Sequence, residues 1–166
     1  AIQLGEQFEC TLQRDGHTVS ASVLIHGLAP SAIAAGIEPA EALLAFMEFL
    51  GDSPLLAFHA GFDQRMLARA LKDTLNLRLR HPFYDVAELA PMLCPQAEIR
   101  NGGLDDWTAY FGLQVGQRHH ASADALVTAE LALILFSRAR KQQADSLKAL
   151  EQRLKSWRQR LQGHSL

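Results

Sequence analysis

The sequence has few cysteines and no excess of positive charge, and these two shortages exclude several classes of protein. Because Cys10 and Cys94 are far apart, neither a disulfide framework nor a cysteine-rich metal site is expected. A reduced, cytoplasmic protein is the simplest prediction. The net charge is −2 over 166 residues, so the molecule as a whole has no cationic field for gripping duplex DNA. Any contact with nucleic acid should therefore be local.

Long apolar runs are also absent from the sequence. No run reaches the length of a membrane-spanning helix, and no signal-peptide pattern is present, so no membrane contact is expected. The chain starts at Ala1 instead of methionine, and Ile2-Gln3-Leu4 follows at once. This start suggests a fragment that lacks upstream sequence.

Segments of strand and helix character alternate along the chain. Strands are predicted at residues 8–12, 55–58 and 80–84, and residues 18–25 are predicted to be a strand or an extended loop. Helices are predicted at residues 39–50, 62–72, 104–111 and 121 to about 140, with one more after residue 84 that Pro91 and Pro95 cut short. The alternation indicates a single α/β layered domain over residues 1–140.

The tail, residues 141–166, has a different pattern and is predicted to be a C-terminal amphipathic helix. Its apolar residues are spaced three and four apart, in the order Leu147, Leu150, Leu154, Trp157 and Leu161. Packing of this seam on its own domain is the favoured interpretation. A homodimer through the same seam is the alternative, although two heptads are few for a coiled coil.

Asp124 is the first candidate for chemistry because it leads an apolar helical stripe. Val127, Thr128 and Leu131 continue this stripe on the same face of the predicted helix. A carboxylate directed into apolar surroundings is costly unless a metal ion or a partner compensates it. The alternative is an ordinary aspartate that the helix dipole favours in the first turn.

His119 lies five residues before Asp124, so the two can face one site only if His119 precedes the helix. A histidine in such a loop suits proton abstraction from water, since its pKa is near neutrality. His120 is closer to the helix start and fits this role less well. The alternative for either residue is an exposed surface histidine.

Asp63 repeats the pattern of Asp124. It leads Met66, Leu67 and Ala70 on one predicted helix face, just past a strand end and Gly61. Acids at the end of a strand are common in α/β active sites, whereas the alternative is a helix-capping aspartate. Two acids and a histidine from separate segments favour metal-assisted hydrolysis with Mg²⁺ or Mn²⁺, since oxygen ligands suit these ions better than zinc.

Two segments carry a family resemblance. Leu56 to Asp63, read LAFHAGFD, resembles the second motif of the DEDDh (DnaQ-like) 3′–5′ exonucleases, the family of the proofreading subunit of DNA polymerase III. His119 to Ala125, read HHASADA, resembles the third motif, with histidine and aspartate at the family's spacing. Weaker matches occur in family order at residues 25–28, 82–85 and 104–112.

The resemblance implies a ribonuclease-H-like mixed sheet flanked by helices, and it implies roles for single residues. Asp124 would bind a catalytic metal directly, Asp63 would help to hold a second one, and His119 would be the general base. His59 and Phe62 would contact the substrate. Two Mg²⁺ or Mn²⁺ ions would support 3′–5′ cleavage at single-stranded DNA or RNA ends, with release of nucleoside monophosphates. A DNA polymerase subunit is the implied protein partner.

The chain departs from the family pattern in two places. Phe58-His59 stands where the family commonly has His-Asn. The first motif, Asp-x-Glu on the first strand, has no counterpart in residues 1–9, so that strand and its neighbour are expected upstream. The alternative to an enzyme is a non-catalytic relative that binds nucleic acid or a polymerase subunit.

Overall fold

The computed structural model describes residues 2, 6–13, 35–99, 101–114, 116 and 120–163. The described elements, in chain order, are α3 (Pro39–Leu50), β1 (Leu55–Ala57), α4 (Ala60–Leu75), β2 (Phe83–Asp85), α5 (Val86–Leu93), the short 3₁₀ helix η1 (Pro95–Ala97), α6 (Leu104–Phe111), α7 (Ala121–Lys141) and α8 (Leu147–Gly163). No helix in these ranges is long and apolar enough to cross a membrane.

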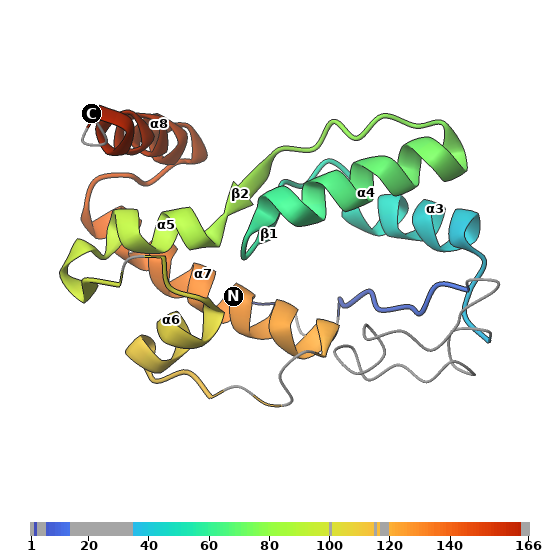
Figure 1. The fold of residues 1–166 in the computed structure, drawn as a ribbon, viewed down its shortest axis with the longest axis horizontal. Coiled ribbons are helices and arrows are strands. Elements are labelled where there is room, and N and C mark those ends of the chain that lie inside the picture. The colour runs from blue at the N-terminus through green and yellow to red at the C-terminus, as the bar shows by residue number, and fades with distance from the viewer. Residues whose placement is uncertain are drawn as a thin grey trace.

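The sheet of the described part consists of β1 and β2, which run parallel with Leu56 opposite Tyr84. Helix α4 connects the two strands, as a parallel pair requires (Figure 1). The predicted α/β class is therefore confirmed. The strand predicted at residues 8–12 is wrong. Within it, a single parallel bridge joins Leu12 to Ile37, and the strand or extended loop predicted at 18–25 lies outside the described residues.

Local signals fix the ends of α3 and α6. At the start of α3 the Glu38 carboxylate accepts hydrogen bonds from the N–H groups of Ala40 and Glu41, with Pro39 at the first helical position. Helix α6 ends at Gly112, whose φ of 66° is a left-handed conformation that glycine adopts without strain. Both helices have the predicted bounds.

Two helices differ from the prediction. Pro91 and Pro95 were expected to cut α5 short; the helix continues through Pro91 and ends at Leu93, before Pro95. A proline in a helix loses one backbone hydrogen bond. Here Val86, Leu89 and Leu93 are each 0% exposed, and their burial offsets that loss. Helix α4 is longer than predicted, since it starts two residues earlier, at Ala60, and ends at Leu75.

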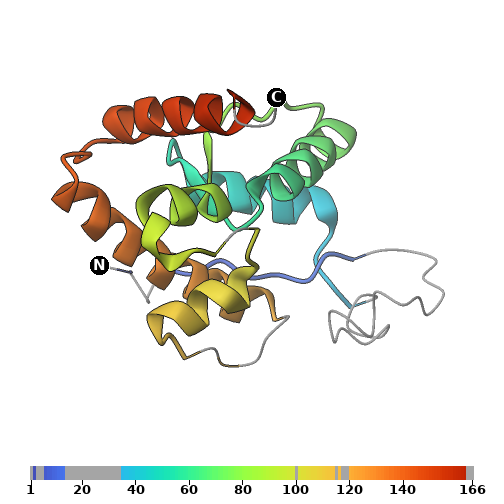
Figure 2. The same cartoon turned by 60° about the vertical axis from the view of Figure 1, so that its left-hand side comes forward.

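The core lies where α5, α6, α7 and α8 meet. These helices gather at one end of the molecule, whereas α3 and α4 lie side by side at the other (Figures 1 and 2). The largest side chains that are fully buried are Trp107, Leu71, Leu89, Leu93, Leu131, Leu135, Val86 and Cys94. The long helix α7 contributes one face to this core and leaves its opposite face available for a surface.

The tail packs on its own domain, as the favoured interpretation expected. Leu150 and Leu154 of α8 are 3% and 5% exposed and belong to the core cluster, while Leu147 and Leu161 remain exposed. Homodimer formation through α8 stays a prediction.

Side-chain hydrogen bonds from α8 reinforce this packing. The Arg158 guanidinium donates two hydrogen bonds to the Glu88 carboxylate of α5. The Tyr84 hydroxyl of β2 donates to Glu151, and this hydrogen bond raises the pKa of Tyr84 to about 12. The contacts tie α8 to β2 and α5.

Candidate active site

A cavity of about 860 Å³ lies between the end of β1, the start of α4, the start of α6 and the exposed side of α7. Its polar lining residues are His59, Asp63, Asp105, Asp124 and Thr128, and its apolar lining residues include Leu56, Phe58, Leu104, Ala129, Ala132, Leu133 and Phe136. The cavity therefore has an acidic part near the helix starts and an apolar part along α7.

Asp124 lies in the first turn of α7 and is half-buried at the edge of this cavity. The stripe that it leads is buried as predicted, with Val127 at 3%, Thr128 at 7% and Leu131 at 0% exposure. The Thr128 hydroxyl donates a 2.7 Å hydrogen bond to the Asp124 carbonyl and so joins the first two turns of α7. The helix therefore directs the Asp124 carboxylate to the cavity, where the helix dipole favours its negative charge.

Asp63 lines the same cavity from the first turn of α4. Desolvation by partial burial raises its pKa, and the negative charge of Asp85 raises it further. A backbone hydrogen bond and the nearby His59 act in the opposite direction. The capping alternative does not describe this residue, because the N-cap of α4 is His59 and Asp63 lies four residues later.

The apolar stripe predicted behind Asp63 is confirmed only in part, because Leu67 and Ala70 are half-buried whereas Met66 is exposed. Met66 is 54% exposed, and the buried residues of α4 are Ala60 and Leu71. Those two positions lie eleven residues apart, on one side of the helix, and α4 contacts α3, β1 and β2. Packing on that side turns Met66 to solvent and leaves Asp63 beside the cavity.

His59 lines the cavity and Phe62 does not, while the substrate contact predicted for His59 stays a prediction. His59 has a left-handed backbone, with φ of 63°, in the turn that joins β1 to α4. Its ring meets the Phe58 ring edge-on, with centroids 4.8 Å apart. The Phe62 side chain is 62% exposed and is not among the residues that line the cavity. A substrate contact by Phe62 stays a prediction.

Asp85 holds the turn beside the cavity, a positioning role that the sequence analysis did not predict. Its Oδ1 atom accepts two hydrogen bonds of 2.9 Å, one from the His59 N–H and one from the Ala87 N–H. One oxygen thus caps α5 and also holds the turn that carries His59. The position of an aspartate between a strand and a helix was visible in the sequence, whereas its bond to a residue 26 positions away was not.

Asp105 is the second residue that sequence reasoning missed. It lines the cavity from the first turn of α6. The neighbouring Asp106 has a local role, because its Oδ2 atom accepts a 2.7 Å hydrogen bond from the Gly103 N–H. Two adjacent acids at a predicted helix start were the available signal, and only one of them is needed for capping.

His119 lies outside the described residues. Helix α7 begins at Ala121 with His120 as its N-cap, so residue 119 precedes the helix, as the predicted geometry requires. The His120 ring Nδ1 is 3.0 Å from the Ser122 hydroxyl and 3.9 Å from a Glu9 carboxylate oxygen. His120 does not line the cavity. The proton-acceptor role of His119 stays a prediction.

The described residues give only part of a metal site. Asp63, Asp105 and Asp124 supply carboxylate oxygens, the donors that Mg²⁺ and Mn²⁺ prefer. No group of three His, Cys, Asp or Glu side chains within the described ranges is close enough to hold an ion. The donor chemistry fits a divalent metal, but the described residues do not complete the set of ligands.

The fold and the cavity define an α/β domain with an acidic site at the carboxyl end of its parallel strands. The chain matches the RNase_T exonuclease family over residues 4–132. It thus belongs to this DnaQ-like family of exonucleases, and the resemblance seen in the sequence is confirmed.

Similar proteins of known name are PolC-type DNA polymerases III. The chain is 31% identical to that of Clostridium perfringens over 102 residues, which are 61% of this chain and 7% of the relative. It is 36% identical to that of Thermotoga maritima over 93 residues, or 56% of this chain and 7% of the relative. For Listeria innocua the identity is 30% over 137 residues, or 81% and 9%. The chain thus spans less than a tenth of the length of these relatives.

Proposed function

We propose that the protein is a metal-dependent 3′–5′ exonuclease that hydrolyses phosphodiester bonds at single-stranded DNA or RNA ends and releases nucleoside monophosphates. One observation carries the proposal: Asp63 and Asp124, which come from two separate motifs, line one cavity together with His59. Membership in an exonuclease family supports the same reaction class. A DNA polymerase partner and a cytoplasmic location are part of the proposal. The first is supported by the PolC-type relatives, and the second by the two free cysteines.

In this proposal Asp124 and Asp63 are metal ligands, and His119 takes the proton of the attacking water from the loop before α7. The bound Mg²⁺ or Mn²⁺ would stabilise negative charge on the phosphate. His59 and Phe62 would contact the terminal nucleotide. The raised pKa of Asp63 supports its role, since groups held in an unfavourable charge state are frequent at functional sites.

The remaining ligands are proposed to come from an Asp-x-Glu motif on a further strand. The cavity lies beside β1, because Leu56 and Ala57 line it and the lining contains no residue of β2. Its opposite wall is the face of α7 that carries Ala129 and Ala132. A strand paired with β1 would bury apolar side chains on α7 and bring its acids beside Asp124. This arrangement would complete the donor set that the described residues leave unfinished.

A non-catalytic module that binds nucleic acid is the second candidate function. The incomplete donor set of the described ranges favours it. The acids of the cavity disfavour it, because a phosphate-binding surface gains nothing from carboxylates that repel phosphate.

Cleavage of labelled oligonucleotides tests the first candidate against the second. A single strand labelled at its 5′ end should shorten one nucleotide at a time in Mn²⁺, and Asp124→Ala should abolish this shortening. Asp145→Ala is the matched control, because Asp145 is exposed and lies between α7 and α8, away from the cavity. Tight binding of the oligonucleotide without any release of nucleotides would replace the exonuclease by the binding module.

A further inference from the structure

Positive charge is concentrated at the C-terminal end of the chain. Residues 138–163 contain eight of the 16 Lys and Arg residues but only two of the 18 Asp and Glu residues. The formal charge of this segment is therefore +6, while the rest of the chain carries −8. The overall charge of −2 hides this separation, which is strong enough to create a local positive potential.

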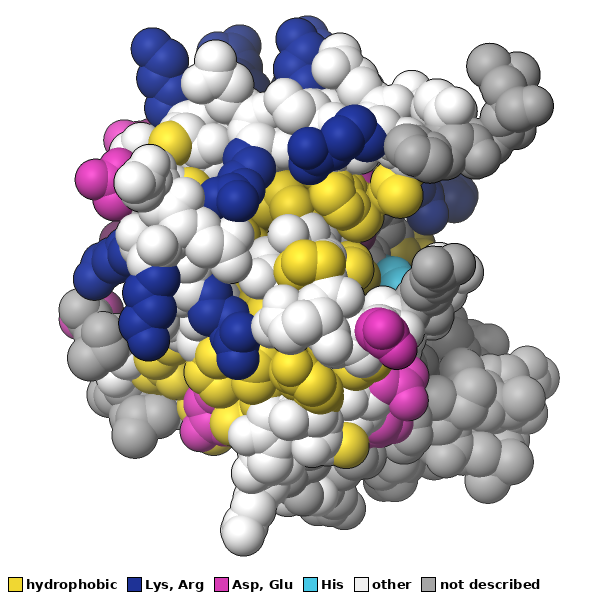
Figure 3. Space-filling view, turned by 90° about the vertical axis from the view of Figure 1, so that its left-hand side faces the viewer, with side chains coloured by type: hydrophobic (Ala, Val, Ile, Leu, Met, Phe, Trp, Pro, Cys, Tyr) yellow, Lys and Arg dark blue, Asp and Glu magenta, His cyan; other side chains and the backbone are white. Residues whose placement is uncertain are grey.

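The fold gathers these cations on one face, here called the basic face, formed by the end of α7 and the outer side of α8. Figure 3 shows Lys and Arg side chains spread over this face around a strip of apolar side chains, with Asp and Glu mainly at its margins. Lys141, Lys148 and Lys155 are exposed. Lys148 and Lys155 are two helical turns apart on the side of α8 opposite the buried Leu150 and Leu154.

Other cations of the segment have structural roles. Arg158 binds Glu88, and Arg153 donates a 2.9 Å hydrogen bond to the Gln142 carbonyl. The Arg138 guanidinium lies 5.2 Å from the centre of the Phe111 ring, a cation–π contact. These contacts hold the backbone beneath the basic face, so the exposed lysines project from a fixed surface.

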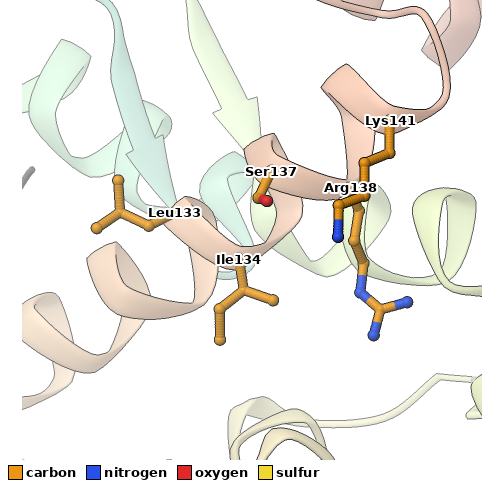
Figure 4. Close-up of a pocket in the computed structure, with 5 residues that line it drawn as sticks. All are labelled: Leu133, Ile134, Ser137, Arg138 and Lys141. Carbon is orange, nitrogen blue, oxygen red and sulfur yellow. The ribbon is translucent and has the colours of Figure 1, made fainter.

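A shallow depression on α7 links the basic face to the acidic cavity. Leu133, Ile134, Ser137, Arg138 and Lys141 line it, and Ile134, Arg138 and Lys141 project from the same side of the helix (Figure 4). Leu133 also lines the acidic cavity, so the two surfaces meet along α7. From Asp124 to Lys141 the helix rises about 25 Å, the length of several nucleotides of a strand.

We propose that the basic face binds the phosphodiester backbone of the nucleic-acid strand whose 3′ end enters the acidic cavity. The proposal rests on the proposed exonuclease function. A polyanionic strand is repelled by the carboxylates that line the cavity, so attraction elsewhere on the protein would help to hold it. Lys141 supplies this attraction in the depression that meets the cavity, and the exposed Lys148 and Lys155 on α8 extend it. An extended phosphate chain can contact all three, because it carries charge along its whole length.

The test measures binding of a fluorescent single-stranded oligonucleotide by anisotropy, in EDTA so that no cleavage occurs. The variant Lys141→Glu, Lys148→Glu, Lys155→Glu should bind at least about tenfold more weakly at 50 mM salt. The slope of log K against log salt should fall by roughly 2, since each phosphate contact to a single strand contributes about 0.7. The corresponding triple glutamine variant should weaken binding and lower the slope to a smaller extent. It keeps the proposal testable if the glutamate variant does not fold.

The matched control is Arg69→Glu, Arg78→Glu, Arg80→Glu, which reverses three exposed cations on and after α4. This control changes the net charge by the same amount as the lysine variant. If the basic face is the contact, the control should change the affinity for the oligonucleotide and the salt slope much less. Equal losses in both variants, an unchanged affinity in the lysine variant, or no binding by the wild type would overturn the proposal. The proposal would also be overturned if the lysine variant bound polyglutamate more weakly than wild type does but bound the oligonucleotide equally well. That result would assign the basic face to an acidic protein partner.

Failure of the proposed function is measured separately. Release of p-nitrophenol from bis(p-nitrophenyl) phosphate in Mn²⁺ reports the acidic cavity, because this small diester does not extend to α8. A wild-type protein that lacks this hydrolysis but binds the oligonucleotide through the three lysines would refute the exonuclease and leave the basic face standing.

Discussion

Replacing Asp85 with alanine removes one oxygen that holds backbone groups from two elements. The Oδ1 atom accepts from the Ala87 N–H at the start of α5 and from the His59 N–H before α4, both at 2.9 Å. Loss of a helix N-cap costs about 1 kcal/mol. A hydrogen bond to a charged group contributes roughly 1.5–3 kcal/mol, and the value for His59 belongs at the lower end because this bond is exposed. The expected loss of unfolding free energy is about 2–3 kcal/mol.

The consequence for activity follows from the turn that Asp85 holds. His59 has a positive φ, a conformation that a non-glycine residue keeps only when its surroundings impose it. Without the bond the turn relaxes, and the start of α4 moves with Asp63. We expect a fall in thermal midpoint of roughly 5–10 °C for a domain of this size, together with a loss of Mn²⁺-dependent cleavage at temperatures where the variant is still folded. Circular dichroism melts, urea titrations and the nuclease assay measure both effects.

Asp85→Asn separates the hydrogen bonds from the charge. Its amide oxygen still accepts from the backbone, so the loss of stability should be about 1 kcal/mol or less. The negative charge near Asp63 is gone, however, and the pKa of Asp63 should fall below its wild-type value. Carboxyl NMR titration reads this shift directly. Wild-type stability in the alanine variant, or an unchanged pKa of Asp63 in the asparagine variant, would refute the reasoning.

Two further predictions concern the proposed catalytic residues. Asp63 has a raised pKa in the folded protein. Its favourable contribution to the unfolding free energy is therefore present below the unfolded pKa near 3.8, and it is lost as the pH rises through the pKa of the folded state. Asp63→Asn should therefore raise the unfolding free energy at pH 7 relative to wild type, with the difference shrinking toward pH 4, while cleavage is lost; destabilisation at pH 7 would return Asp63 to a structural role. His119→Ala should reduce turnover severely and leave Mn²⁺ affinity, measured by calorimetry, nearly intact, and a parallel loss of Mn²⁺ binding would make His119 a ligand instead of a base.

Helix ends were predictable wherever a local signal sets them. The Pro39 start, the Gly51 stop and the Gly112 stop act within one or two turns, so the bounds of α3 and α6 could be predicted from the sequence. The uninterrupted helix from Ala121 was predictable for the same reason, since its apolar pattern continues over many turns. These features depend on neighbours in the chain and hardly on the fold.

The wrong predictions concern features that tertiary contacts decide. Pro91 should interrupt a helix in isolation, but α5 is packed between α7 and α8 and keeps its course. Met66 belongs to an apolar stripe by spacing, yet α4 presents a different side to α3 and the sheet. Spacing shows which residues share a face, whereas only the assembled layers decide which face is covered.

The candidate site was predictable in part for a similar reason. Asp63 and Asp124 stand inside recognisable motifs, and the fold brings both to one cavity. Asp85 and Asp105 went unassigned because their roles depend on the arrangement of separate elements, β1 against β2 for the first and α6 against α7 for the second. A carboxylate that serves a distant backbone group looks, in the sequence, like any other helix cap.

Helix α8 shows how a slightly acidic chain can work on a polyanion. Glu151 of this helix accepts a hydrogen bond from Tyr84 in β2, the strand that ends at Asp85. Arg158 binds Glu88 of α5. The side of α8 turned away from the buried Leu150 and Leu154 carries Lys148 and Lys155 to solvent. The same helix therefore stabilises the elements behind the acidic cavity and supplies the Lys side chains that the lining of the cavity does not contain. Carboxylates suited to divalent metals and lysines suited to phosphates would weaken each other if they were mixed, because each would neutralise the other's charge. Their separation along α7 and α8 keeps both available to one strand.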